Sequence, residues 1–197
     1  VQNGLAKIKA LDVQVVCNSH GPVLTRGCRL EWAMDRYEEW SRPQKNEVPL
    51  IPLFYCSAYG NTGKIADMLR AGILEEIPHA DCQIYDINAH DMAFLQGLLN
   101  RSDAFGIGSP TINADAVAPV WNLLSHVDAI NNRKRPVLVF GSYGWSGEAV
   151  PNLTARMQQL RLSLPLEGMR VRFCPTQEDL AAAVQFGRDF AKAVRGE

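Results

Sequence analysis

The sequence lacks the features that mark several specialised classes of protein. Its 197 residues contain no apolar run near the ~18 residues that a membrane-spanning helix needs. With 20 Lys and Arg against 21 Asp and Glu, it carries neither a basic patch for nucleic acid nor a polybasic signal for anionic lipid. It begins with neither a Met nor a signal peptide. We therefore expect a soluble intracellular domain, cut from a longer protein, that binds no nucleic acid and spans no membrane.

The cysteines are few, and their spacing shows no motif of paired cysteines. There are five, an odd number, and no C-x-x-C pair occurs among them. This disfavours a disulfide framework. Apolar or strand-like sequence flanks most of them, as at Cys17 and Cys56. We therefore expect buried, reduced thiols in a reducing compartment.

The beginning of the chain differs from the rest. A strand is predicted over 13–17, and a helix over 29–40 whose apolar residues share one face. Residues 41–48 are polar and contain a proline, which is typical of a linker. One strand and one helix cannot bury a core of their own. We therefore expect 1–46 to be the end of another domain with its linker, and 47–197 to form a domain.

From Val48 onward, strands and helices alternate. Strands are predicted at 49–56, 82–85, 104–108, 135–141 and 169–174, and helices at 61–77, 91–99, 116–130, 149–162 and 177–194. Continuous apolar runs such as PLIPLFYC are typical of strands buried on both faces. Thr176 is the expected N-cap of the last helix. The alternation predicts an α/β fold with a parallel sheet between two helical layers, whose ligands bind at the carboxyl ends of the strands.

The loop after the first strand of this domain reads SAYGNT at 57–62 and leads directly into a helix. Its hydroxyls, together with the N–H groups of a helix N-terminus, suit a phosphate. Neither G-x-x-x-x-G-K-[ST] nor G-x-G-x-x-G occurs, which disfavours P-loop and dinucleotide folds. Taken alone, the loop is equally consistent with an ordinary capped helix start.

Two further loops follow buried strands. Residues 108–113 read GSPTIN, and residues 141–148 read GSYGWSGE. The second combines two aromatic rings with three glycines, whose backbone a ligand can approach closely. One loop suited to phosphate and two suited to a flat ring, all at the ends of parallel strands, predict a ring that bears a ribityl phosphate. That ligand is FMN.

The motifs resemble those of a known family. The S-x-x-G-[NS]-T loop at 57–62 resembles flavodoxin, and GSPTIN at 108–113, FGSYGWSG at 140–147 and RVRFCPTQEDL at 170–180 are similar to the flavodoxin domain of flavodiiron proteins. The leading SHGP at 19–22, followed by a helix ending in YEEWS, resembles the end of that family's metallo-β-lactamase-like domain. The resemblance implies a flavodoxin-like, doubly wound, five-stranded parallel sheet (three-layer α/β/α), preceded by a strand-plus-helix remnant of a metallo-β-lactamase-like domain.

The resemblance also implies three groups of FMN-binding residues. These are Ser57, Ala58, Tyr59, Gly60, Asn61 and Thr62 for the phosphate; Ser109, Pro110, Thr111, Ile112 and Asn113 for the ribityl chain and the pyrimidine edge; and Ser142, Tyr143, Gly144, Trp145 and Gly147 for the other wall. Tyr143 or Trp145 would stack on the ring, and the sequence does not choose between them. Trp32, Trp40 and Trp121 are expected to pack within the fold instead. No catalytic acid or base is expected, because the chemistry of the domain would be electron relay.

In function, the chain resembles the FMN-binding electron-transfer domain of a flavodiiron oxidoreductase, which relays electrons to a diiron centre that reduces O2 or NO. The donor would be NAD(P)H through a reductase domain or protein, or a small redox protein, and the parent would form a head-to-tail homo- or hetero-oligomer in the cytoplasm or a plastid stroma. His20 matches the family's last metal-binding histidine, but the H-x-E-x-D-H run is absent. We therefore expect a metal at His20 only in a complete parent, and no catalytically complete diiron site in this chain.

Two alternatives stay open at this point. One is a free-standing flavodoxin-type electron carrier or an NAD(P)H:quinone reductase, although neither carries the SHGP segment and a free flavodoxin is markedly acidic. The other is a cofactor-free flavodoxin-fold dimerisation module. Thr62, Asn113 and the Gly144-Trp145 pair argue against it without excluding it.

Overall fold

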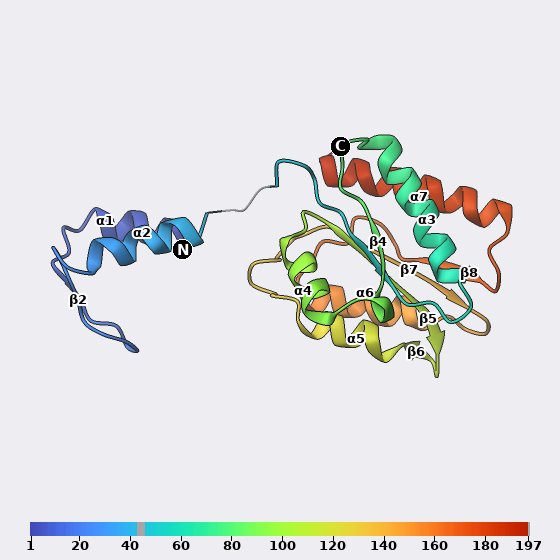
Figure 1. Ribbon diagram of the computed structural model, residues 1–197, viewed down its shortest axis with the longest axis horizontal. Coiled ribbons are helices and arrows are strands. Elements are labelled where there is room, and N and C mark those ends of the chain that lie inside the picture. The colour runs from blue at the N-terminus through green and yellow to red at the C-terminus, as the bar shows by residue number, and fades with distance from the viewer. Residues whose placement is uncertain (43–45, 197) are drawn as a thin grey trace. The chain divides into compact units, whose positions relative to one another are not determined.

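The computed structural model describes residues 1–42 and 46–196, which form two compact units (Figure 1). The first unit is Val1–Lys45 and the second is Asn46–Glu197. Residues 43–45, which belong to the predicted linker, lie outside the described residues.

The first unit consists of two helices and a short hairpin. Its elements are α1 (Gln2–Lys9), β1 (Val15–Val16), β2 (Leu24–Thr25) and α2 (Leu30–Trp40). The strands pair antiparallel, with Val15 opposite Thr25. The strand at β1 and the helix at α2 are confirmed, whereas α1 and β2 were not expected. Helix α1 has no side-chain N-cap and no acidic residue in its first turn, so it lacks the sequence signals of a helix start.

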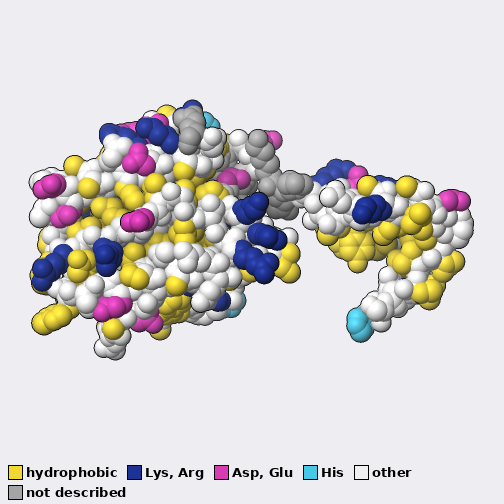
Figure 2. Space-filling model, turned by 180° about the vertical axis from the view of Figure 1, so that it is seen from behind, with side chains coloured by type: hydrophobic (Ala, Val, Ile, Leu, Met, Phe, Trp, Pro, Cys, Tyr) yellow, Lys and Arg dark blue, Asp and Glu magenta, His cyan; other side chains and the backbone are white. Residues whose placement is uncertain are grey.

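Little of the apolar surface of this unit is buried. Only Leu5, Leu30 and Ala33 are buried among residues 1–42. Trp32 and Trp40 are 60% and 69% exposed, so the expectation that they pack within the fold is wrong. Figure 2 shows hydrophobic side chains gathered on one face of the unit. The spacing of Trp32 and Trp40 along the helix indicated apolar side chains that could be buried. It did not show whether another part of the protein covers them.

The second unit is built on a sheet of five parallel strands. They are β3 (Leu53–Tyr55), β4 (Ile84–Asp86), β5 (Phe105–Ile112), β7 (Val137–Tyr143) and β8 (Met169–Arg172). Their order is β4-β3-β5-β7-β8, and the short β6 (Asp115–Ala116) pairs antiparallel with the end of β5. Strand order reverses between β3 and β5, which is the switch point of a flavodoxin-like sheet.

Helices cover both faces of the sheet. Helices α3 (Asn61–Glu76) and α7 (Gln177–Arg195) lie on one face, and α4 (Met92–Arg101), α5 (Ala118–Ser125) and α6 (Ala149–Gln159) lie on the other (Figure 1). A short 3-10 helix, η1 (Ile87–Ala89), follows β4. The predicted three-layer α/β/α architecture is confirmed. None of the described helices combines the length and apolarity of a transmembrane span.

Alternating side chains of the strands separate two cores. Along β7, Val137 and Val139 pack in the cluster beneath α4, α5 and α6, whereas Leu138 and Phe140 pack beneath α3 and α7. Successive side chains of a strand point to opposite faces, so a strand in the middle of three layers is apolar throughout. This is why the buried strands appear in the sequence as continuous apolar runs.

The helices α3 and α7 pack with their backbones in close contact. A Cβ atom built on Gly187 would lie 2.3 Å from the backbone oxygen of Leu69, and one built on Gly72 would lie 2.0 Å from that of Val184. Only glycine allows the two backbones to approach so closely. The N-cap predicted for α7 is confirmed, because Thr176 Oγ1 accepts from Asp179 N at 3.1 Å.

Several element boundaries differ from those predicted. Strand β3 begins at Leu53, four residues later than predicted. Strand β5 runs on to Ile112, so most of the segment expected to be a loop after residue 108 is strand. Helix α5 ends at Ser125 rather than at residue 130. Beyond it, Asp128 accepts hydrogen bonds from the backbone N–H groups of Ile130 and Asn131, which closes a turn in place of further helix.

The two ends of the second unit are fixed by side chains at the amino ends of the strands. Asn46 Nδ2 donates to Asp103 Oδ2 at 2.9 Å, and the same oxygen accepts from Leu50 N at 2.8 Å. At the far end of the chain, Arg195 Nη1 donates to the backbone oxygen of Glu76 at 3.4 Å. Glu76 ends α3, which runs from the carboxyl end of the sheet to its amino end.

Candidate functional site

Three loops meet at the carboxyl edge of the sheet, beside the switch point. They follow β3, β5 and β7, the three adjacent central strands, in which Tyr55 pairs with Gly108 and Pro110 with Ser142. The loops that the sequence indicated are therefore brought to one edge. In α/β sheets this edge is where ligands bind.

The first loop ends in the N-terminus of α3. Gly60 is the N-cap, with a φ of 79°, a left-handed conformation that glycine adopts without steric cost. The first N–H groups of an α-helix have no acceptor within the helix, and the helix dipole makes this end positive. Ser57 Oγ is buried and has no hydrogen-bond partner among the described residues. A buried hydroxyl without a partner is costly, so this loop is suited to an added acceptor such as a phosphate oxygen.

Thr62, in the first turn of α3, is fully buried and tied to another strand. Its Oγ1 lies 2.8 Å from Ser142 Oγ, and either atom can donate. The bond joins the first loop to the end of β7, although the two residues are 80 positions apart. Nothing in the sequence indicated this contact. Each hydroxyl has one proton and two lone pairs, so both keep bonding capacity beyond the shared bond.

The remaining predicted residues of the first loop face outward. Ala58 and Gly60 are exposed and Asn61 is half-buried. Tyr59 is 90% exposed, although it is a large aromatic side chain. Trp145, in the third loop, is 92% exposed. Exposed rings on two loops at one edge are the kind of surface on which a flat ligand stacks.

The second loop is a two-residue turn between β5 and β6. Ile112 pairs with Asp115, and the turn residues Asn113 and Ala114 both have positive φ, 52° and 58°. This is the pattern of a type I′ hairpin, which the sequence did not reveal because alanine replaces the usual glycine. Asp115 fixes the hairpin, since its Oδ2 accepts from Trp121 Nε1 at 3.2 Å.

Two predicted site residues use their hydroxyls to hold loops rather than to face the site. Buried Ser109 accepts from Val117 N at 3.1 Å through Oγ. Thr111 Oγ1 accepts from Ala149 N, at the start of α6, at 3.3 Å. Their side chains thus join the end of β5 to the two helices that follow. Pro110 is buried beside them, and Ile112 is exposed.

The third loop bends around a second glycine with positive φ. Gly147 has a φ of 77°, and a Cβ there would lie 3.0 Å from the ring of Tyr143. The half-buried Tyr143 ring therefore packs within its own loop, whereas Trp145 points to solvent. Gly144 is half-buried between them.

Two residues to which the sequence assigned no role border the third loop. Phe173 follows β8, and its ring reaches Gly144. Glu148 precedes α6, and its Oε2 is buried without a hydrogen-bond partner among the described residues. A hydrogen bond with the Ser146 side chain is the main cause that lowers the pKa of the Glu148 carboxyl. Glu148 lies in the motif GSYGWSGE and Phe173 in RVRFCPTQEDL, but the sequence indicated no role for either side chain.

The candidate metal ligand lies in the first unit. His20 is exposed, in the turn between β1 and β2. Within residues 1–42 and 46–196, no three His, Cys, Asp or Glu side chains gather closely enough to hold a metal ion. The structure therefore brings no second ligand to His20 among these residues.

The cysteines are divided between buried and exposed positions. Cys56 and Cys82 are buried, and burial raises the pKa of each thiol to about 12. Cys17, Cys28 and Cys174 are exposed, so for these three the expectation of burial is wrong. Apolar neighbours in sequence indicate a strand or its end, but not that both of its faces are covered.

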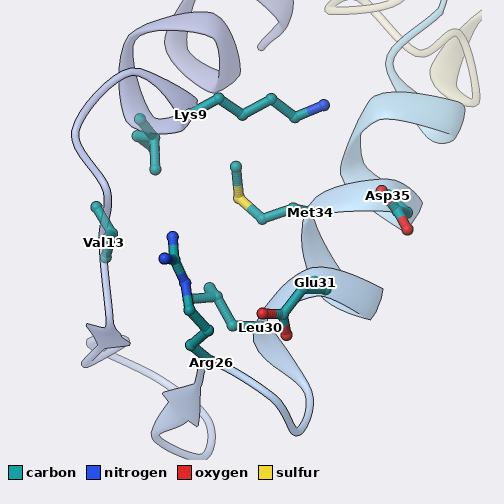
Figure 3. Close-up of a pocket in the computed structure, with 8 residues that line it drawn as sticks. Lys9, Val13, Arg26, Leu30, Glu31, Met34 and Asp35 are labelled. Atoms are coloured by element: carbon teal, nitrogen blue, oxygen red, sulfur yellow. The ribbon is translucent and has the colours of Figure 1, made fainter.

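The first unit also has a hollow of about 200 Å3 between α1, the hairpin and α2 (Figure 3). Lys9, Arg26 and Met34 reach into it from these three elements. Its cations are already paired, Lys9 with Glu38 and Arg26 with Asp12. The hollow therefore offers apolar surface but no unpaired lysine or arginine among its lining residues.

Comparison with known proteins points to one group. The family model described as Flavodoxin matches residues 53–187. The chain is 40% identical to the flavo-diiron protein FprA2 of Clostridium acetobutylicum over 98% of its own length and 48% of that protein. It is 33% identical to the type A flavoprotein fprA of Rhodobacter capsulatus over 100% of its own length and 45% of that protein. The chain thus spans about half the length of these curated relatives.

Solved structures give the same result. The flavodiiron core of Flv1 from Synechocystis superposes with a TM-score of 0.70 at 29% identity, over 99% of this chain and 47% of that one. A flavodoxin from the domain Archaea superposes with a TM-score of 0.65 at 25% identity, over 74% of this chain and 98% of that one. The first similarity covers both units, and the second covers a length close to that of the second unit alone.

Proposed function

The chain belongs to the flavodoxin family, and we propose that its second unit binds FMN and relays electrons within a longer flavodiiron oxidoreductase. The observation that carries this proposal is the buried, unpartnered hydroxyl of Ser57 at the N-terminus of α3. A hydroxyl held without a partner is stabilised when a ligand oxygen arrives. FMN, when bound, supplies a ring that accepts and releases electrons.

The phosphate would be held without a cation in the loop. Ser57 Oγ, the backbone around Gly60 and the first turn of α3 supply hydroxyl and N–H donors. Lys64 is the nearest cation in sequence, and it is exposed. Thr62 takes part through its bond to Ser142, which fixes the phosphate loop against the end of β7.

The ring would lie between the second and third loops. Trp145 is the aromatic side chain there that no contact within its loop engages, which supports Trp145 rather than Tyr143 as the stacking partner. The exposed Ile112 and Asn113 of the hairpin turn would border the ribityl chain and the pyrimidine edge. These residues bind and orient the cofactor, and none needs to move a proton.

In the longer protein, electrons would pass from a reduced donor through FMN to a diiron centre that reduces O2 or NO. The kinship with flavodiiron proteins, which extends over both units, supports this role. We propose that His20 becomes an iron ligand only when the rest of the metal domain is present. A head-to-tail oligomer would then bring the FMN of one subunit near the iron of another.

The primary test is an absorption spectrum of the purified chain after incubation with FMN and desalting. We expect the visible bands of oxidised flavin at one FMN per chain. A folded chain that remains colourless would contradict the proposed FMN site and would favour a dimerisation module.

A Ser57→Ala variant tests the phosphate contact. We expect FMN affinity to fall by the equivalent of about 1–3 kcal/mol, because one hydrogen bond to a charged group is lost. Riboflavin, which lacks the phosphate, should bind the variant and the wild type equally. Because Ser57 Oγ has no partner in the free protein, the free energy of unfolding should not decrease. A matched control is Ser125→Ala, whose hydroxyl bonds Asn122 O at 2.7 Å on α5.

The catalytic role is tested in the full-length parent. There, Ser57→Ala should lower FMN content and the rates of O2 and NO consumption together, while iron content stays unchanged. Comparison of the two gases identifies the acceptor. Unchanged rates in a protein that has lost FMN would contradict electron relay through this domain.

A further inference from the structure

Phe173 has an unfavourable backbone conformation for its side chain. It follows the last residue of β8 with a φ of 58°, in the left-handed region where a bulky L-residue is an outlier. Its N–H donates to the backbone oxygen of Tyr143 at 2.7 Å, which extends the pairing of β7 with β8. The ring is 58% exposed, so burial alone does not account for an aromatic residue here. Glycine or asparagine would adopt this backbone more easily.

The ring of Phe173 contacts the third loop of the site. A Cβ built on Gly144 would lie 3.3 Å from Cε1 and 3.8 Å from Cδ1 of the phenyl ring. The ring edge therefore lies on the side of Gly144 to which a side chain would project. The guanidinium carbon of Arg172 is 5.2 Å from the centroid of the same ring, in cation–π contact.

The third loop is thus held by two aromatic rings. Phe173 contacts it at Gly144 from the neighbouring strand, and Tyr143 packs against Gly147 within the loop. Both contact points are glycines, where a side chain would displace either the ring or the loop. Trp145 lies between the two contact points in the sequence.

We propose that Phe173 is a positioning residue, which holds the loop 143–147 in its binding conformation before FMN arrives. The inference rests on the proposed function, since it concerns the same site. A loop that is already ordered loses little conformational entropy when the ligand binds. The binding free energy is therefore more favourable, because that entropy cost is avoided. The backbone conformation with positive φ at Phe173 is the one from which its ring reaches Gly144.

Two substitutions separate the ring from the backbone strain. Phe173→Asn removes the ring and introduces a residue that tolerates positive φ, whereas Phe173→Tyr keeps the ring. We expect the FMN dissociation constant of Phe173→Asn to rise about tenfold through loss of preorganisation, with a Tm equal to or above that of the wild type. Phe173→Tyr should bind FMN within about twofold of the wild type, because the ring contact remains. FMN binding by Phe173→Asn equal to the wild type would overturn the proposal.

A double-mutant cycle tests the contact itself. Gly144→Ala alone should weaken FMN binding, because the new methyl group meets the phenyl ring. In the background of Phe173→Asn, the same substitution should have little further effect, since the ring is gone. Additive losses would show that Gly144 and Phe173 act independently and would overturn the proposal.

Amide hydrogen exchange of residues 141–148 in the FMN-free protein gives a readout that does not depend on the cofactor. We expect faster exchange in Phe173→Asn than in the wild type and in Phe173→Tyr. If the wild type binds no FMN, the proposed function fails while exchange still decides the role of Phe173. Equal exchange in all three proteins would overturn the proposal even if FMN binds.

Discussion

The α3–α7 contact and the loops at the carboxyl edge both depend on glycine, but for different reasons. Gly72 and Gly187 have ordinary helical backbones, and their lack of a side chain lets two helices touch. Gly60 and Gly147 have positive φ, and they let loops turn around a ligand site. Close contact stabilises the fold in the first case. In the second, the backbone of Gly60 is open to a ligand, whereas Gly147 lets the loop fold against the ring of Tyr143.

The side chains around these glycines differ in the same way. Beneath α3 and α7, large residues such as Phe140 and Phe190 are fully buried. At the loops, Tyr59 and Trp145 are almost fully exposed. The comparison teaches that the buried helix contact contributes to the stability of the unit, while its ligand-binding capacity lies at one edge of the sheet. Substitutions in the contact between α3 and α7 should therefore change the free energy of unfolding, whereas substitutions in the loops should change the affinity for FMN.

The largest expected effect is that of Gly187→Ala. The added methyl group would lie 2.3 Å from the backbone oxygen of Leu69, so the helices must separate. We expect the free energy of unfolding to fall by about 3 kcal/mol, the upper part of the range for overpacking. Thermal unfolding measures the loss. Below the Tm, FMN binding should remain, because no residue of the loops is altered.

Gly97→Ala is the matched control. Gly97 lies exposed within α4, and a Cβ there meets nothing within 4 Å. The substitution should raise the free energy of unfolding by about 0.5–1 kcal/mol, the difference in helix propensity. If both variants changed stability equally, the contact between α3 and α7 would not be the stabilising feature described above.

The buried thiols of the two regions should each make the free energy of unfolding depend on pH in the alkaline range. Cys82 packs beneath α3 and α7, and Cys56 lies directly before the first loop. Burial raises the pKa of both to about 12, so on unfolding above about pH 9 the thiols lose protons that the folded state retains. Stability should thus be unaffected at neutral pH and fall between pH 9 and 12, by up to about 1.4 kcal/mol per pH unit for each thiol.

Urea denaturation across this pH range measures the slope. Cys82→Ala and Cys56→Ala should each make the fall in stability with pH less steep. The double variant should lose the contributions of both thiols to this pH dependence. A pH dependence that persists in the double variant would assign the effect to other groups, such as the tyrosines Tyr55 and Tyr85, whose pKa values burial also raises.

The smallest expected effect is that of Ala114→Gly at the hairpin turn. Ala114 has a φ of 58°, which costs an L-residue about 1 kcal/mol and glycine nothing. We expect a rise of up to about 1 kcal/mol in the free energy of unfolding, offset in part by the greater freedom of glycine in the unfolded chain. Ala93→Gly, at an exposed position of α4, should instead lower it by a similar amount. A loss of stability in Ala114→Gly would contradict the turn assignment.

The sequence was sufficient to predict the layered architecture. Strands buried between two helical layers are apolar on both faces, so VLVF at 137–140 stands out as a continuous apolar run. The loops that follow β3, β5 and β7 could be located because they come directly after such runs. Parallel pairing then brings them to one edge, whatever their distance along the chain.

Other features depend on contacts that no local pattern encodes. The bond between Thr62 and Ser142 and the contact between Phe173 and Gly144 join residues that are far apart in sequence. The exposure of Trp32 and Trp40 was likewise not predictable, because an apolar helix face shows what can be buried, not what covers it. Strand β6 was missed because its turn uses Ala114, where glycine would have been the signal.

The anchoring of Asn46 by Asp103 and of Arg195 by Glu76 bears on how such a unit can be combined with others. Both ends of the unit leave from the amino edge of the sheet, and the three loops lie at the opposite edge (Figure 1). Further polypeptide can therefore be joined at either end without being threaded past the loops. The unit can thus be fused to different domains at either end, by evolution or by design, while the three loops at the carboxyl edge of its sheet stay the same.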